Sequence, residues 1–190
     1  MPNTLEDKQL IIITGSEGAK DVFEVVKYVL TQYQKPFLSF TAGEENPEEF
    51  GNEPVAIILC EEGRLNDYAH HIALITNIQD MKDGDFDTHV GNYEKMVDRT
   101  PKAGSVVYHE DDNISAVICK KERPDVTPYS FGAPAIKHNH DESIFKIEKE
   151  EIILKDCDER RAQSIKAAYV LLKILRVTEK DFINILEKWN

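Results

Sequence analysis

The stretch that decides the fold is QLIIITGSEGAKD, residues 9–21. Its first six residues form an almost continuous apolar run rich in isoleucine, which is typical of a strand buried on both faces of a parallel sheet. Gly15 ends the run, and apolar side chains then recur every three or four positions over residues 20–34. That spacing predicts an amphipathic helix. A buried strand that passes through a glycine turn into a helix is the unit from which α/β folds are built.

The same alternation continues along the chain. Further strands are predicted over residues 36–40, 55–60, 72–76, 105–108 and 126–131, of which 55–60 and 72–76 repeat the buried pattern. Helices are predicted over 93–100, 113–118, 156–176 and 179–189, with Asp111 or Asp112 and Thr178 as N-caps of the second and the last. The segments 144–147 and 151–154 alternate polar and apolar residues and predict a small β-hairpin. We therefore expect one domain over residues 1–190, with a three-layer α/β fold whose mainly parallel sheet is flanked by helices.

The predicted order of elements also leads to two expectations about geometry. Ligands of open parallel sheets bind beyond the carboxyl ends of the strands. The loops at Gly15, Glu61 and Asn77 each follow a predicted strand, so we expect them to lie at one edge of the sheet. The helix over 156–176 has a broad apolar face, which should pack on the sheet and bury Ile165, Tyr169 and Leu172.

Composition and charge exclude several classes of function. The chain of 190 residues has 23 Lys and Arg against 35 Asp and Glu, and this net charge of -12 repels nucleic acid and anionic membrane surfaces. Its apolar runs fall far short of the roughly 20 residues of a membrane-spanning helix. The N-terminal residues contain no signal-peptide pattern, and Cys60, Cys119 and Cys157 form no CxxC pair. We expect a cytoplasmic protein with reduced thiols.

The turn TGSEGAKD, residues 14–21, is the first candidate ligand site, because a glycine turn before a helix can cradle a phosphate. The candidate nucleotide-binding residues are Gly15, Ser16, Gly18 and Lys20. A phosphate loop requires Gly-Lys-Ser/Thr, in which the lysine reaches the β and γ phosphates and the hydroxyl holds magnesium. Here Ala19 precedes the lysine and Asp21 replaces the hydroxyl. The loop is therefore either a degraded nucleotide site or an ordinary strand-to-helix turn.

Two further groups of residues have the chemistry of metal ligands. Glu61 and Glu62 follow the strand predicted over 55–60, where an acidic residue can hold magnesium directly or through water. A solvated strand end is the alternative in so acidic a chain. The segment 138–141, His-Asn-His-Asp, also has ligand spacing, but it has no further partner in the sequence, which favours a solvated loop.

Seven motifs, in this order, resemble the central domain of the Mur ligases, the ATP-dependent amide-forming enzymes of peptidoglycan precursor synthesis. In that family one strand ends in TGT-x-GK-TT, a second in an acidic motif, and a third in TN-I followed by DH-x-D. The corresponding stretches here are IIITGSEGAKD (11–21), AIILCEE (56–62) and LITNIQDMKDGD (74–85). Later matches are KAGSVVYHEDDN (102–113), PYSFG (128–132), RAQSIKAA (161–168) and LRVTEKDFINIL (175–186). The resemblance covers nearly the whole chain.

The resemblance breaks where the chemistry of the family lies. The lysine is displaced to position 20, Asp21 stands in place of the hydroxyl, and Met81 stands in place of the histidine of DH-x-D, directly after Asp80. The family implies ATP and Mg²⁺ as cofactors, with the metal held here by Glu61, Glu62 and Asp80. The three departures leave two alternatives, a site that holds ATP and Mg²⁺ and a site that holds no cofactor.

Two hypotheses about function result. The first is a Mur-ligase-like domain with degraded ATP and magnesium motifs, which serves as a non-catalytic binding or regulatory module linked to peptidoglycan precursor metabolism. Its partners would be a nucleotide, a cell-wall precursor or another protein. The alternative is an ATP-dependent ligase core of the UDP-N-acetylmuramate ligase type, acting with domains missing from this chain. We expect Lys20 to face the strand edge, because ATP binding by a Mur-ligase-like domain needs it there. We favour the first hypothesis over this alternative and over a third, an α/β protein with no ligand at this edge.

Overall fold

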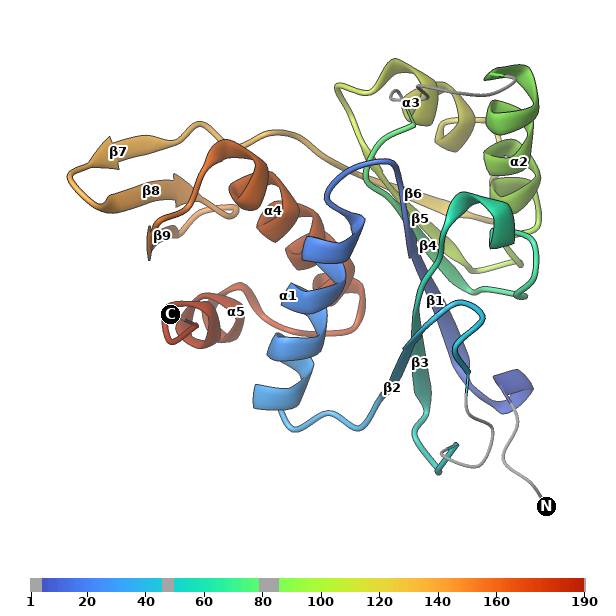
Figure 1. Ribbon diagram of the computed structural model, residues 1–190, viewed down its shortest axis with the longest axis horizontal. Helices are drawn as coiled ribbons and strands as arrows, with labels where there is room; N and C mark the ends of the chain where they lie inside the picture. Colours follow the sequence, from blue (N-terminus) through green and yellow to red (C-terminus); the bar gives the residue numbers. More distant parts are fainter. Residues whose placement is uncertain (1–4, 46–49, 79–85, 190) are drawn as a thin grey trace.

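The computed structural model describes residues 5–45, 50–78 and 86–189. Its main feature is a six-stranded sheet with the order β2-β3-β1-β4-β5-β6, in which every neighbouring pair is parallel. The strands are β1 (Gln9–Thr14), β2 (Leu38–Thr41), β3 (Val55–Leu59), β4 (Ile72–Ile75), β5 (Ser105–His109) and β6 (Thr127–Phe131). The six predicted strands are confirmed, and β1 lies inside the sheet (Figure 1).

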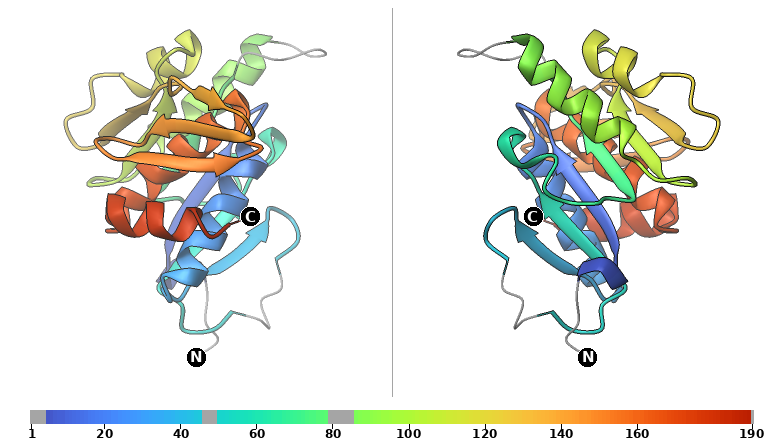
Figure 2. Two further views of the ribbon diagram at one scale, coloured as in Figure 1. Left: turned by 90° about the vertical axis from the view of Figure 1, so that its left-hand side faces the viewer. Right: turned by 90° about the vertical axis from the view of Figure 1, so that its right-hand side faces the viewer.

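Helices cover both faces of this sheet (Figures 1 and 2). One layer contains α1 (Ala19–Gln32), α4 (Glu159–Ile174) and α5 (Glu179–Leu186), and the other contains α2 (Phe86–Asp98) and α3 (Asn113–Cys119). Alternate side chains of β1 pack against the two helical layers. Ile11 and Ile13 belong to the core under α1 and α4, whereas Leu10 and Ile12 belong to the core under α2 and α3. The predicted three-layer α/β fold is confirmed.

The sequence signals for helix ends and helix faces are mostly confirmed. The Asp112 carboxylate and the Thr178 hydroxyl cap α3 and α5 as predicted, each accepting a backbone N–H of the first turn. The predicted apolar face of α4 is buried through its length. One prediction was wrong in extent, because α2 begins at Phe86 and not at Tyr93. No helix in the described ranges is both long and apolar enough to cross a bilayer.

A second, smaller sheet lies beside α4 and is antiparallel (Figure 1). Its strands are β7 (Lys137–Asn139), β8 (Glu142–Lys146) and β9 (Glu151–Lys155), in that order. The predicted hairpin corresponds to β8 and β9, and β7 adds a third strand that the sequence did not predict. Only one face of this sheet is buried, because Phe145, Ile152 and Leu154 join the core under α1 and α4.

One side chain fixes the turn between β8 and β9. Glu179, the first residue of α5, accepts the backbone N–H groups of Glu148, Lys149 and Glu150 with one carboxylate oxygen, at 2.7, 2.8 and 3.1 Å. Burial alone would raise the pKa of Glu179, but these three hydrogen bonds outweigh it and hold the pKa below its usual range. The last helix is thereby tied to the hairpin.

Candidate functional site

Three loops meet at the carboxyl edge of the large sheet, as the sequence predicted. They follow β1 at Gly15, β3 at Glu61 and β4 at Asn77. These strands are direct neighbours in the order β3-β1-β4, and all run parallel. Polar side chains that follow them are therefore delivered to one side of the molecule, where open parallel sheets bind ligands.

The β1–α1 loop needs glycine at two positions for steric reasons. Gly15 has φ +133°, and a Cβ there would collide with the Thr76 hydroxyl and the backbone of Asn77. Gly18, the N-cap of α1, has φ +75°, and a Cβ there would lie 3.0 Å from the Ser164 hydroxyl of α4. The loop is thus pressed between the end of β4 and the start of α4.

Asn77 holds this loop with both its backbone and its side chain. The Ser16 N–H donates to the Asn77 carbonyl oxygen at 3.2 Å, and the Glu17 N–H donates to Asn77 Oδ1 at 2.9 Å. In a phosphate loop such N–H groups are directed at the phosphate. Here two of them are already used inside the protein.

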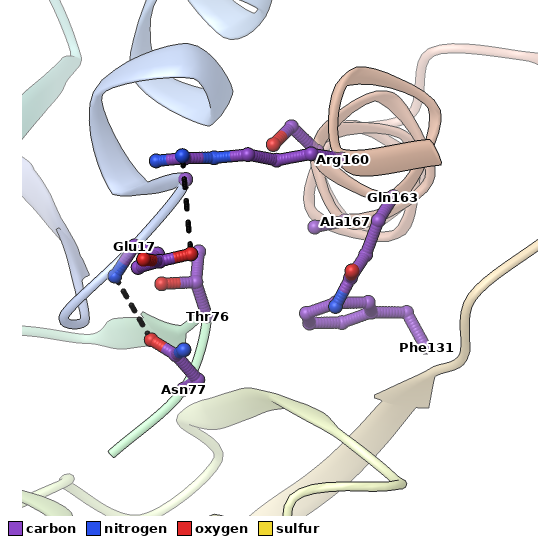
Figure 3. A pocket seen from close by; sticks show the side chains of 9 residues that line it. Glu17, Thr76, Asn77, Phe131, Arg160, Gln163 and Ala167 are labelled. Atoms are coloured by element: carbon purple, nitrogen blue, oxygen red, sulfur yellow. Dashed lines mark hydrogen bonds and ion pairs between the residues drawn. The ribbon is translucent and has the colours of Figure 1, made fainter. Parts of the chain in front are cut away.

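A small cavity of about 60 Å³ lies beside the loop (Figure 3). Its walls are Glu17 and Gly18 of the loop, Thr76 and Asn77 after β4, Phe131 at the end of β6, and the first turns of α4. Typical pockets for whole small molecules measure about 300–1,000 Å³. This cavity alone can hold a small group such as a carboxylate or a phosphate, and a neighbouring pocket of about 500 Å³ shares Glu17, Arg160 and Gln163 with it.

An ion pair spans the cavity. The Arg160 guanidinium, from the first turn of α4, extends across to the Glu17 carboxylate, with 3.9 Å between the nearest nitrogen and oxygen (Figure 3). Both side chains are more than half exposed, so water screens the pair and it contributes little to stability. Arg160 is therefore free to exchange Glu17 for another anion.

The opposite wall contains a chain of polar contacts. Gln163 Nε2 lies 3.0 Å from Nε2 of His109, at the end of β5, and that imidazole lies 3.6 Å from the Asp111 carboxylate. The His109 ring also packs on Phe131, with 5.2 Å between ring centroids. These contacts fix the Gln163 amide at the cavity wall.

Solved structures with a similar arrangement of elements include several ligases. A UDP-N-acetylmuramoylalanyl-D-glutamyl-2,6-diaminopimelate--D-alanyl-D-alanyl ligase from Acinetobacter baumannii matches with a TM-score of 0.77 at 18% identity, over 96% of this chain and 46% of that chain. The MurF ligase from Thermotoga maritima, in complex with ADP, gives 0.71 at 15% identity, over 93% and 48%. A pseudomurein peptide ligase type C from Methanothermus fervidus gives 0.67 at 14% identity, over 96% and 50%.

The chain has a Mur-ligase-like fold. It spans about half the length of these ligases. No protein-family model and no curated protein matches the sequence. At these identities the likeness concerns the fold, and it agrees with the resemblance that the order of sequence motifs indicated.

The predicted nucleotide-binding residues occupy different places within the Mur-ligase-like fold. Gly15, Ser16 and Gly18 form the β1–α1 loop, and Gly18 lines the cavity. Lys20 lies in the first turn of α1, where it is exposed, does not line the cavity, and makes no hydrogen bond or ion pair with the described part of the chain. Nucleotide binding by these four residues stays a prediction.

The described part of the structure does not bring the predicted metal-binding residues together. Glu61 is exposed and precedes the short 3₁₀ helix η3 (Glu62–Arg64), while the Glu62 carboxylate contacts Nδ1 of the buried His89. Asp80 lies outside the described residues. Within those ranges, including the segment 138–141, no group of three His, Cys, Asp or Glu side chains could hold a metal ion. A metal site at Glu61, Glu62 and Asp80 therefore stays a prediction.

Sequence reasoning did not single out three residues that the structure brings to the cavity. They are Glu17, Phe131 and Arg160. Glu17 and Phe131 do fall within the quoted motifs, but a motif does not say which of its side chains faces the site. No local sequence pattern marks Arg160 as a site residue, since it reaches Glu17 only because α4 begins opposite the β1–α1 loop.

Proposed function

We propose that this chain is a non-catalytic binding module with a Mur-ligase-like fold, linked to peptidoglycan precursor metabolism. One observation carries the proposal. The β1–α1 loop is held by other parts of the protein. Asn77 accepts hydrogen bonds from the N–H groups of Ser16 and Glu17, and the Arg160–Glu17 ion pair spans the adjoining cavity. A loop in this state presents a carboxylate where a phosphate-transferring site presents a cation.

The described residues at this edge do not fit magnesium-bound ATP. Transfer of a phosphoryl group depends on positive charge that is already aimed at the phosphates. Glu17 and Asp21 bring negative charge to the loop and to the first turn of α1, and Lys20 does not line the cavity. We therefore derive no step in which this chain activates a carboxylate with ATP.

The cavity does fit a small anionic group of a larger ligand. The Arg160 guanidinium can exchange Glu17 for a carboxylate or phosphate in two-point contact, and the Gln163 and Asn77 amides can complete its hydrogen bonds. A nucleotide or a cell-wall precursor offers such groups. The names of the similar structures support this class, because they describe ligases of muramoyl and pseudomurein peptides, one of them with ADP.

Isothermal titration calorimetry tests the proposal with ADP, with ATP plus Mg²⁺ and with inorganic phosphate as separate probes. We expect Arg160→Gln to weaken binding about tenfold, because one charge-assisted contact is lost. Lys20→Ala, the matched control on α1, should leave the affinity unchanged. Release of phosphate from ATP should not exceed the rate without protein.

The alternative is an ATP-dependent ligase core that acts with domains from another chain. It is favoured by the similarity to ligases about twice as long as this chain. Micromolar binding of ATP with Mg²⁺ that disappears in Lys20→Ala would support the alternative and contradict the binding module. Binding that depends on Arg160 alone would support the module.

A further inference from the structure

The strand β9 has an outer edge with no strand beside it. The small sheet has the order β7-β8-β9, and the Ile147 N–H donates to the Glu150 carbonyl at the turn between β8 and β9. Hydrogen-bonded and non-hydrogen-bonded pairs alternate from that turn onward. The backbone N–H and C=O groups of Glu151, Ile153 and Lys155 therefore point away from β8. No described residue forms a hydrogen bond with them.

The outward side chains of β9 form a symmetric pattern. Ile153 is 46% exposed at the centre of the strand, and its neighbours on the same face are an acid, Glu151, and a base, Lys155. The cross-strand partner of Ile153 on β8 is the half-buried Ile144, so the apolar surface continues across the sheet. An exposed edge strand with an apolar centre is a template for pairing with another strand.

We propose that two copies of this chain pair through antiparallel β9 edges, with the twofold axis at Ile153. In this register Ile153 lies opposite Ile153 of the second copy. Glu151 lies opposite Lys155 of the second copy, and the reverse contact is made on the other side of the axis. The three residues whose backbone groups point outward then all fall in hydrogen-bonded pairs. The result is one continuous six-stranded antiparallel sheet across the dimer.

Charge selects this arrangement over its competitors. A parallel pairing in register would place Glu151 against Glu151 and Lys155 against Lys155, and like charges directly opposite each other are unfavourable. A shift by two residues would place Ile153 against a charged side chain and would lose both ion pairs. The other edge of the sheet, Lys137–Asn139, has three residues, all polar and exposed, and offers no apolar centre. The sequence EIILK is complementary to itself only in the antiparallel register centred on Ile153.

The edge is already ordered before it pairs. Ile152 and Leu154 are buried on the inner face of β9, and Glu179 holds the turn that precedes the strand. Pairing therefore orders few additional side chains, which lowers the entropic cost of association. The small sheet lies on the outside of the helical layer that contains α4 (Figures 1 and 2).

Sedimentation velocity of the full chain, from micromolar to millimolar concentration, tests the proposal. We expect a reversible dimer, and we expect Ile153→Pro to remain monomeric throughout. Proline is tolerated on an edge strand where the N–H faces solvent, so the variant should keep the thermal midpoint and circular dichroism spectrum of the parent. A parent chain that is monomeric at millimolar concentration, or an Ile153→Pro chain that still dimerises, would overturn the proposal.

Charge exchange provides a second measurement that does not rely on proline. Glu151→Lys places lysine opposite lysine, and Lys155→Glu places glutamate opposite glutamate, so each variant alone should dimerise about tenfold more weakly. Mixing the two variants restores both ion pairs and should produce heterodimers at the parent's affinity. Because each folded chain is the same in the mixture as alone, a change in monomer stability cannot produce this result. A mixture that associates no better than its components would overturn the pairing.

Discussion

The two sheets of this protein use isoleucine in opposite ways. In the parallel sheet helices cover both faces, and Ile11, Ile12 and Ile13 of β1 have no exposed surface. In the antiparallel sheet one face is open to water, and Ile153 of β9 is 46% exposed. The same residue type thus contributes packing in one sheet and accessible apolar surface in the other. The contribution of a strand residue depends on which faces and edges are covered.

The largest effect that separates the two sheets is expected from a matched pair of truncations. Ile12→Ala removes three buried carbons between two packed layers and should lower the free energy of unfolding by about 3–4 kcal/mol. Ile153→Ala should change it by less than about 0.5 kcal/mol in the monomer. Urea unfolding at low protein concentration measures both. Equal losses would contradict the contrast between the sheets.

A second expectation concerns the amino edge of the parallel sheet, where His70 is buried against Thr100. Burial, helped by the positive charges of Arg99 and His71, lowers the pKa of His70 from 6.5 to about 4. The unfolded chain therefore binds the proton more readily, so stability is complete above pH 6.5 and falls as the pH is lowered toward 4. The loss should reach about 3 kcal/mol.

Unfolding of the parent chain and of His70→Gln between pH 7 and pH 4 checks this expectation. The variant should be less stable at neutral pH, and its stability should fall less steeply with acid. Parallel curves for the two chains would show that another group controls the acid sensitivity of the parallel sheet.

A smaller effect is expected where α5 holds the antiparallel sheet. Glu179→Gln keeps an acceptor oxygen but removes its charge, so the free energy of unfolding should fall by about 1 kcal/mol at neutral pH. Since the pKa of Glu179 is lowered, the carboxylate stabilises the fold above the ordinary glutamate pKa, and this contribution disappears as the pH falls through the lowered value. The parent and the variant should converge in acid. Glu187→Gln, on the exposed end of the same helix, is the matched control.

The smallest effect is expected at Lys20. The side chain is exposed and has no partner among the described residues, so Lys20→Ala should change the free energy of unfolding by less than about 0.5 kcal/mol. Thermal melting checks this before the calorimetry of ligand binding. A larger loss would mean that Lys20 has a structural role in the β1–α1 region, and the variant would then be unsuitable as a binding control.

The central strands of the parallel sheet were predictable from sequence because strands buried on both faces are apolar almost without interruption. Residues 9–14 were predicted as the strand that β1 forms. β7 was not predictable, since Lys137, His138 and Asn139 have no apolar side chain and are extended only because they pair with β8. The early start of α2 was hidden for a related reason. Its first turns include His89, whose burial depends on contacts with Glu62 and Tyr93.

The positions of the loops that form the candidate site were predictable from the sequence, but the side-chain contacts within it were not. Glycine turns after buried strands located the loops at Gly15 and Asn77, and parallel topology placed them together. The Asn77 hydrogen bonds to the loop and the Arg160–Glu17 contact depend on how a loop closes and where a distant helix starts. Those are properties of the packed chain, and no local pattern encodes them.

The three hydrogen bonds to Glu179 have a consequence for the order in which the protein is made. The turn at residues 148–150 leaves the ribosome before the carboxylate that fixes it, because Glu179 follows Glu150 by 29 positions in the sequence. The β8–β9 hairpin therefore emerges without its three hydrogen bonds to Glu179. Its turn, and with it the open edge of β9, is fixed only after α5 has been synthesised. In the nascent chain this hairpin should become resistant to proteolysis only after α5 has emerged, well after the first βα unit is resistant.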